Sequence, residues 1–193
     1  DQLAEELRIR GLFFERYNRS SVSEKMLNAI IGWKTLQKGE TIPFKVLKDM
    51  YYYMSGNNHI AHGYKDLKAA DEEKEYDHEA LVMFHGLNVH IAREWHVALD
   101  NIPESQQAYI TAALQRQQDF NVSKNIKLST IHAAKGGEAD HVMLLTDLPK
   151  KVDDNYFVQQ DDERRVFYVG VTRAKKSLHV IESESTREFK EIF

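Results

Sequence analysis

The sequence has 193 residues, of which 42% are hydrophobic and 29% charged, a balance typical of one globular domain or of one domain with an inserted subdomain. It contains no cysteine, which excludes disulfide bonds, thiolate metal sites and thiol redox chemistry. The formal net charge of -4 argues against a uniformly basic nucleic-acid-binding surface, so any grip on DNA is expected to be local.

The sequence shows neither a membrane span nor a signal peptide, because no apolar run is long enough and the first residues lack the basic-then-apolar order. We therefore expect a soluble protein, and the lack of cysteine fits a reducing cytoplasm. The chain does not begin with Met, and its first residues resemble the middle of an amphipathic helix. We interpret it as part of a longer protein in which another strand precedes this helix.

The N-terminal part predicts two helices separated by a strand. A partial apolar stripe over residues 3–9 predicts a helix that ends at Gly11, and residues 12–17 have the composition of a short strand. Turn and capping residues occupy 18–23. Apolar residues with helical spacing over 26–36 then predict a second helix.

The segment 41–124 is predicted to be a mostly helical insertion, with helical spacing over 46–54, 91–99 and 109–120. The acidic run at 71–77 is most simply a solvated loop. With eight basic and twelve acidic residues, this segment carries a charge of -4, which argues against a broad DNA-binding platform.

The C-terminal part predicts an α/β arrangement with a parallel sheet. We expect a strand at 126–130, a loop or short helical turn at 133–140, a near-continuous apolar strand of the buried type at 141–146, a helix at 161–175 and a strand at 177–182. This order of elements is typical of parallel sheets. Ligands of such sheets lie at the carboxyl ends of the strands, where we expect the polar segments described next.

The first polar segment combines features of an anion-binding loop. Thr130 and His132 end the predicted strand, Lys135 follows, and Gly136 and Gly137 permit tight backbone paths whose amide groups can face a phosphate. In the alternative reading, the first two residues merely end a strand and Lys135 is solvated. This segment alone leaves both readings open.

The second polar segment lies on the predicted helix 161–175. Arg165, Tyr168 and Thr172 share one helix face, and Arg173 emerges near the helix end, where its rigid fork of donors suits a phosphoryl oxygen. In the alternative reading, residues 163–165 form surface ion pairs and Arg173 is a cation favoured by the helix dipole. An adjacent apolar face is predicted to pack on the sheet, and its members are Phe167, Val171 and Ala174.

Together the two segments resemble the two C-terminal motifs of UvrD-like superfamily 1 helicases. Residues 130–138 match T-x-H-x-x-K-G-x-E, and residues 163–174 match E-R-R-x-x-Y-V-x-x-T-R-A in the same order. The resemblance is dense over about 126–182 and loose over 1–40. One departure lies at residues 135–139. The family usually has K-G-L-E-F there, and this chain has Gly137 in place of the leucine and Ala139 in place of the phenylalanine.

The resemblance implies a RecA-like domain, that is, a parallel sheet flanked by helices. This second RecA-like domain would be discontinuous and consist of residues 1–40 and 125–193, with 41–124 as a reduced form of the family's inserted domain. The UvrD-like form of Ala134-Lys135-Gly136 implies movement from 3′ to 5′ along DNA.

The resemblance also implies functional roles. Arg173 would be the arginine finger, the catalytic residue that acts on ATP and Mg²⁺ held by a separate N-terminal RecA-like domain. The implied nucleotide-binding residues are Glu138, Gly136, Gly137, Arg173 and Arg165. The implied single-stranded DNA contacts are Thr130, His132, Lys135 and Tyr168. If the resemblance is set aside, Glu138 simply caps the following turn.

The sequence contains no G-x-x-x-x-G-K-[ST] phosphate-binding loop, so the chain alone is expected to be inactive as an ATPase. We also expect it to be monomeric. Two other hypotheses remain open. The chain could be a standalone nucleic-acid-binding or partner-binding module derived from a helicase, or an unrelated small-molecule α/β enzyme.

Other residues support weaker hypotheses. Trp33 and Trp95 are predicted to anchor the core, whereas residues 51–53 are three tyrosines that cannot all be buried, so one of them could stack on a base. The histidines have no cysteine or tight carboxylate set around them. The acidic pairs at 153–154 and 161–162 are interpreted as solvated, and no metal site is predicted.

Overall fold

The computed structural model describes residues 2–56, 58–116, 125–154, 156–182, 186–189 and 191. The chain divides into two compact units, Asp1–Leu128 and Ser129–Phe193. The sequence analysis predicts another division, in which residues 1–40 and 125–193 form one domain, and this stays a prediction. Its boundary at residue 124 lies outside the described residues.

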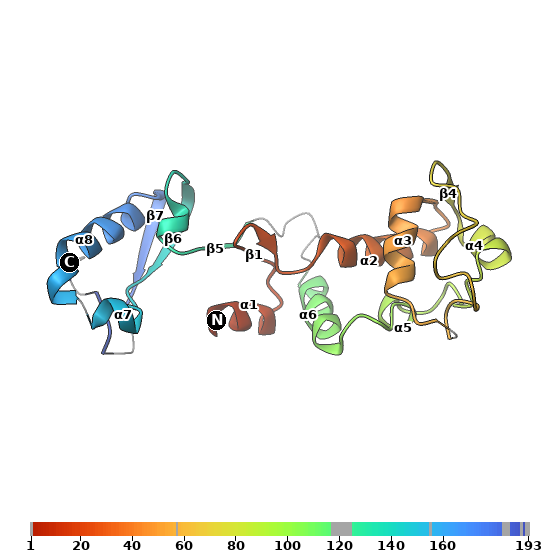
Figure 1. Ribbon diagram of the computed structural model, residues 1–193, viewed down its shortest axis with the longest axis horizontal. Helices are drawn as coiled ribbons and strands as arrows, with labels where there is room; N and C mark the ends of the chain where they lie inside the picture. Colours follow the sequence, from red (N-terminus) through yellow and green to blue (C-terminus); the bar gives the residue numbers. More distant parts are fainter. Residues whose placement is uncertain are drawn as a thin grey trace. The chain divides into compact units, whose positions relative to one another are not determined.

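The first unit combines helices with short strands (Figure 1). Strand β1 pairs antiparallel with β2 and parallel with β5, and β3 pairs antiparallel with β4. In chain order the described elements are α1 (Gln2–Ile9), β1 (Glu15–Arg16), β2 (Arg19–Ser20), α2 (Glu24–Gln37), β3 (Ile42–Pro43), α3 (Phe44–Tyr52), β4 (Glu75–Tyr76), α4 (His78–Phe84), α5 (Trp95–Ala98), α6 (Glu104–Gln115) and β5 (Lys127–Leu128).

The two N-terminal helices end and begin where the sequence predicts. Gly11 has a φ of 62° just after α1, a left-handed conformation that favours glycine. Ser23 caps α2, because its hydroxyl accepts a hydrogen bond from the Met26 amide at 3.2 Å. The strand predicted at 12–17 is shorter than expected: β1 ends at Arg16 because the next two residues adopt positive φ and turn the chain into β2.

The core of the first unit forms around α2 and α3. Trp33 and Trp95 are both buried, as predicted, and the indole nitrogen of Trp33 donates to the Arg93 carbonyl at 2.8 Å. The helix expected at 91–99 is wrong in extent, since only α5 forms. The chain ahead of α5 is held in a turn, in which the His90 ring accepts from the Ala92 amide.

Two other expectations for the insertion need adjustment. The helix expected at 109–120 begins earlier, since α6 covers Glu104–Gln115, and residues 117–120 lie outside the described part. The acidic run at 71–77 is mostly loop, as predicted, but it also contains β4, which pairs with β3.

The second unit is a small α/β unit. Strands β6 and β7 pair in parallel, with Val142 opposite Leu178 and Leu144 opposite Val180, and α8 lies beside them (Figure 1). This confirms an α/β fold with parallel strand pairing. The larger RecA-like sheet is not seen among the described residues and stays a prediction. The described elements are η2 (His132–Ala134), β6 (Ala139–Leu145), α7 (Lys150–Asp153), α8 (Tyr156–Val171) and β7 (Ala174–Ile181).

A close contact between α8 and β6 builds the core of this unit. Gly170 is buried in α8, and a Cβ atom added there would lie 2.9 Å from Leu144 Cδ1. Phe167 is buried beside it and stacks on Phe189, with ring centroids 4.0 Å apart. Glycine at position 170 therefore lets the helix approach the strand closely.

Two predictions about the second unit are wrong. The strand predicted to be buried over 141–146 is buried on one face only: Leu144 lies under α8, whereas Met143 is 74% exposed, because side chains alternate across the sheet. Ala174 does not belong to the apolar helix face. The helix ends at Val171, and Ala174 begins β7 opposite Ala139.

None of the helices in the described part of the chain is long and apolar enough to span a membrane.

Candidate functional site

The two polar segments singled out in the sequence meet in the second unit. The first runs from Thr130 through η2 to Glu138, just before β6, and the second ends at Arg173, just before β7. Because β6 and β7 are parallel, the residues that precede them lie at the same edge of the sheet. For Glu138 and Arg173 the expected position at carboxyl strand ends is therefore wrong, since both lie where strands begin.

Arg173 ties the end of α8 to the loop before β6. Its Nη1 donates to the Gly137 carbonyl at 3.1 Å and its Nε donates to the Val169 carbonyl at 2.9 Å. Its Nη2 donates to the Thr172 hydroxyl at 2.9 Å, and that hydroxyl donates to the Val169 carbonyl at 3.1 Å. All three guanidinium nitrogens therefore have an acceptor within the unit, and the side chain is held in one position.

The loop beside Arg173 adopts a tight path that glycine permits. Gly136 has a φ of 82°, in the left-handed region, with open space around its Cα. Gly137 has an ordinary φ, and its amide donates to the Ala134 carbonyl at 3.0 Å. Only the first glycine is required by the backbone conformation.

Two ion pairs that the sequence analysis missed flank this loop. Lys175 pairs with Glu138 at 3.1 Å, and Lys176 pairs with Asp140 at 2.7 Å. These pairs form because the strand register places Ala139 opposite Ala174. The sequence does not reveal this register. All four side chains are more than half exposed, so each pair contributes little stability and the cations stay available to an anion.

Thr130 has a structural role in the observed geometry. Its hydroxyl accepts a hydrogen bond from the Ala133 amide at 3.2 Å and so caps the η2 turn. This agrees with the alternative interpretation, in which Thr130 only ends a strand. The hydroxyl proton is still free for a second contact, because a hydroxyl both donates and accepts.

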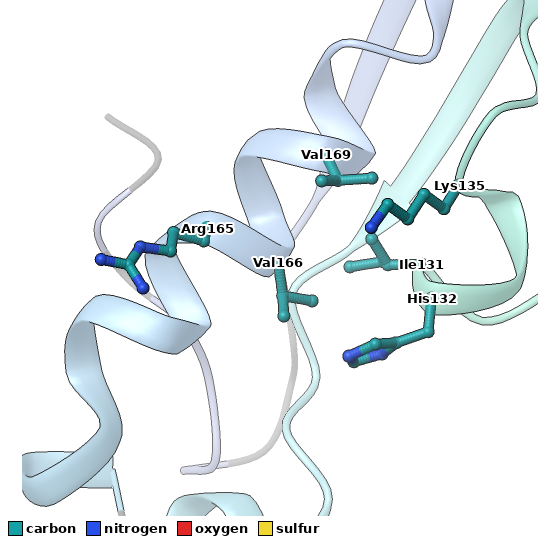
Figure 2. Close-up of a pocket in the computed structure, with 6 residues that line it drawn as sticks. All are labelled: Ile131, His132, Lys135, Arg165, Val166 and Val169. Atoms are coloured by element: carbon teal, nitrogen blue, oxygen red, sulfur yellow. The ribbon is translucent and has the colours of Figure 1, made fainter.

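A cavity of about 180 Å³ lies between η2 and α8 (Figure 2). Its lining residues are Ile131, His132, Lys135, Arg165, Val166 and Val169. The branched apolar side chains form its walls, and His132 and Lys135 lie on the η2 side, on exposed positions. Three residues predicted from the sequence thus line one cavity.

The arginines of α8 differ in their surroundings. The Arg165 guanidinium extends away from His132 and Lys135 (Figure 2) and donates to Asp162 at 3.2 Å. Arg164 pairs with Glu191 and with Asp161, and these hydrogen bonds raise the pKa of its guanidinium. Both therefore form surface ion pairs, as the simpler reading of residues 163–165 proposes.

Tyr168 also stands apart from the cavity. It is 70% exposed on α8, and the structure does not bring it to the residues that line the cavity. Val169, its neighbour, connects the two parts of the site, because its side chain lines the cavity while its carbonyl accepts from Arg173.

The arrangement can bind anions but does not form a metal site. Arg173, Lys135 and the two lysines at the start of β7 provide positive charge beside a glycine-containing loop, which suits phosphate oxygens. In the described residues, no group of three or more His, Asp or Glu side chains is arranged to hold a metal ion.

Comparison with known proteins gives matches over part of the chain. The profile of the family described as "UvrD-like helicase C-terminal domain" matches residues 59–185. This match begins well before the motifs and includes much of the segment 41–124, in which the sequence analysis recognised little of the family. No solved structure matches the chain.

Three curated proteins are similar to part of the chain. The DNA helicase II of Rickettsia typhi is 37% identical over 80 residues, which cover 38% of this chain and 12% of the relative. The probable DNA helicase II homologs of Rickettsia conorii and Rickettsia felis have the same identity and coverage. The aligned part is thus a small fraction of the length of these relatives.

Proposed function

The chain belongs to the family of UvrD-like helicase C-terminal domains, and from this membership we propose that it completes the ATPase site of a DNA helicase or translocase. The observation that carries the proposal is the contact between Arg173 and the Gly137 carbonyl at 3.1 Å. Arg164 and Arg165 pair with carboxylates, whereas Arg173 has no carboxylate partner in the described structure. The contact places Arg173 beside the loop that includes Glu138.

We propose that residues 1–40 and 125–193 form one RecA-like domain. The parallel pairing of β1 with β5, in which Glu15 lies opposite Lys127, supports this proposal. It joins the N-terminal segment to the strand that directly precedes the second unit. The helical residues between them would then be an insertion at the surface of that domain.

Arg173 is the proposed catalytic residue. ATP supplies the phosphoryl group, and Mg²⁺ its counter-charge, in a site formed mainly by an N-terminal RecA-like domain. A guanidinium is permanently charged and presents a planar fork, so Arg173 can donate to phosphoryl oxygens on which charge accumulates. It can donate the second N–H of Nη1 and of Nη2, or exchange its bond to the Gly137 carbonyl for a bond to one of those oxygens.

The loop 136–138 is the proposed nucleotide-facing part of the chain. The Lys135 and Gly137 amides already donate within the turn, which leaves the Gly136 and Glu138 amides for an anion, and Lys175 pairs with Glu138 at the same edge. Arg165 contacts the nucleotide in this proposal only after its ion pair with Asp162 opens. Opening costs little free energy, because the pair is exposed.

His132 and Lys135 are the proposed contacts with single-stranded DNA, together with Thr130 and Tyr168. The first two line the cavity between η2 and α8, whose apolar walls suit a sugar or base edge next to a phosphate. The Gly137 amide donates to the Ala134 carbonyl within the same turn, so hydrogen bonds connect Arg173 to the turn that carries these residues. The proposed direction, 3′ to 5′, rests on Ala134-Lys135-Gly136.

The test compares the 193-residue chain with a longer protein that also carries a phosphate-binding loop. We expect the chain alone to hydrolyse no ATP and the longer protein to hydrolyse ATP when single-stranded DNA is present. Robust turnover by the chain alone, abolished by Arg173→Ala, would overturn the proposal.

A second candidate is a nucleic-acid-binding or partner-binding module without ATPase activity. The absence of a phosphate-binding loop from the sequence favours it over any self-sufficient enzyme. It predicts that the natural protein contains no such loop at all, whereas the helicase proposal requires one.

A further inference from the structure

Of the three consecutive tyrosines of α3 and its end, only Tyr52 faces solvent. Tyr51 is buried and its hydroxyl donates to the His85 carbonyl at 3.0 Å, and burial raises the pKa of Tyr51. Tyr53 is also buried, whereas Tyr52 is 57% exposed. The first unit therefore presents one of the three rings to solvent, at a distance along the chain from the motifs of the second unit.

The Tyr52 ring is held in place. The ammonium of Lys25, on α2, lies 3.2 Å from the centre of the ring, a close cation–π contact. The ring of Tyr53 meets it edge to face, with centroids 5.0 Å apart. A ring that is already ordered loses little conformational entropy when a ligand stacks on it.

The nearby acids are occupied by other partners. Glu24 pairs with Lys45 at 3.0 Å, and Asp49 accepts a hydrogen bond from the Asn28 amide at 2.9 Å. Lys48 lies one turn before Tyr52 on the exposed face of α3, and neither it nor Lys25 has an acidic partner among the described residues. Two cations thus flank an exposed aromatic ring.

The surrounding sequence is cationic in an otherwise acidic chain. Residues 16–53 contain seven Lys or Arg and three Asp or Glu, whereas the whole chain has a net charge of -4. A nucleotide combines an aromatic base with an anionic phosphate, and a ring beside two ammonium groups matches this combination. An acidic peptide would use the two lysines but not the exposed ring.

We propose that Lys25, Lys48 and Tyr52, here called the α2–α3 patch, bind single-stranded nucleic acid: Lys25 leaves the ring to pair with a phosphate, a base stacks on the ring face that Lys25 frees, and Lys48 pairs with a second phosphate. The patch lies in the first unit and involves none of the residues assigned to ATP hydrolysis. It adds a second contact for a nucleic-acid strand.

The test uses the 193-residue chain and a short oligothymidylate that carries 5-iodouracil. Ultraviolet cross-linking followed by peptide mapping is expected to mark the peptide that contains Tyr52. Tyr52→Leu should abolish that cross-link and weaken binding, measured by fluorescence anisotropy, roughly tenfold. Lys48→Gln should reduce the slope of log K against log salt by about 0.7.

Matched controls come from the same unit. Phe84→Leu removes another exposed aromatic ring and Lys68→Gln another exposed lysine, and both should leave binding unchanged. Cross-links confined to residues 129–193, with unchanged affinity in Tyr52→Leu, would overturn the proposal while leaving the helicase assignment intact. It is also overturned if an oligoglutamate peptide of equal charge competes as well as the oligonucleotide.

Discussion

Arg173 donates a hydrogen bond from Nη1 to the carbonyl oxygen of Gly137 at 3.1 Å. This bond joins the last turn of α8 to the loop before β6, and the neighbouring bonds to Val169 and Thr172 complete the set. The arginine is thus both a brace of the resting loop and the proposed donor to a nucleotide. Nη1 has two N–H bonds, so a bound nucleotide releases the loop only if it accepts the one that now donates to Gly137.

The two adjacent glycines of this loop should respond differently to substitution. Gly136→Ala should destabilise the chain by about 1 kcal/mol, because a side chain at positive φ is strained. Gly137→Ala should be nearly neutral, since its φ is ordinary and the added Cβ would lie 3.5 Å from the Ala134 carbonyl oxygen. Urea denaturation of the two variants measures the difference, and equal losses would contradict the observed backbone.

Gly170 is predicted to be a packing position. An added Cβ would lie 2.9 Å from Leu144 Cδ1 and 3.5 Å from Ile131 Cδ1, so Gly170→Ala should force α8 away from β6. The expected loss is about 1–2 kcal/mol, since the overpacking cost exceeds the gain in helix propensity. Thermal unfolding of the variant tests this, and a raised melting temperature would show that the helix moves freely.

Lys135 is predicted to contact a nucleic-acid phosphate. In titrations of an oligonucleotide at several salt concentrations, Lys135→Gln should weaken binding and reduce the salt slope by about 0.7. Lys150→Gln, at an exposed position of α7, is the control and should preserve the slope. His132→Ala should weaken binding in the same assay. Identical curves for Lys135→Gln and the unmodified chain would remove this residue from the site.

His85 is predicted to make stability depend on pH. Burial lowers the pKa of His85, which packs edge to face on Tyr76 with centroids 5.0 Å apart. The unfolded chain therefore binds a proton below about pH 6.5 that the folded chain rejects. The free energy of unfolding should fall as the pH drops below that value, until the lower folded pKa is passed.

Denaturation of His85→Gln at a series of pH values checks this prediction. The variant should show a shallower fall below about pH 6.5 than the unmodified chain. A steeper fall in His85→Gln would mean that the native ring is protonated.

Local signals predicted the element boundaries that depend on neighbouring residues. Ser23 and Gly11 mark helix ends because each satisfies backbone groups within its own turn. The strand at 12–17 was overestimated, since nothing local indicates that Tyr17 adopts a positive φ. The prediction that the strand at 141–146 is buried on both faces was wrong, because an apolar run does not show how many faces of the sheet are covered.

The motifs predicted that Arg173 lies beside the loop 136–138, but not how it is held there. Arg173 and Gly137 are far apart in sequence, and their contact depends on the packing of α8 on β6. The pairs of Lys175 with Glu138 and Lys176 with Asp140 depend on strand register in the same way. Sequence alone placed Ala174 on the helix because helical spacing continues past the residue at which the helix ends.

The most direct measurement is the turnover number of DNA-stimulated ATP hydrolysis for Arg173→Lys in a longer protein that joins this chain to a domain with a phosphate-binding loop. Lysine keeps the charge but loses the fork of donors, so we predict a fall of about a thousandfold, with DNA affinity little changed. Arg164→Lys, which alters a surface ion pair, is the matched control. Turnover of Arg173→Lys equal to that of the control would contradict the assignment of Arg173 as the residue that acts on ATP.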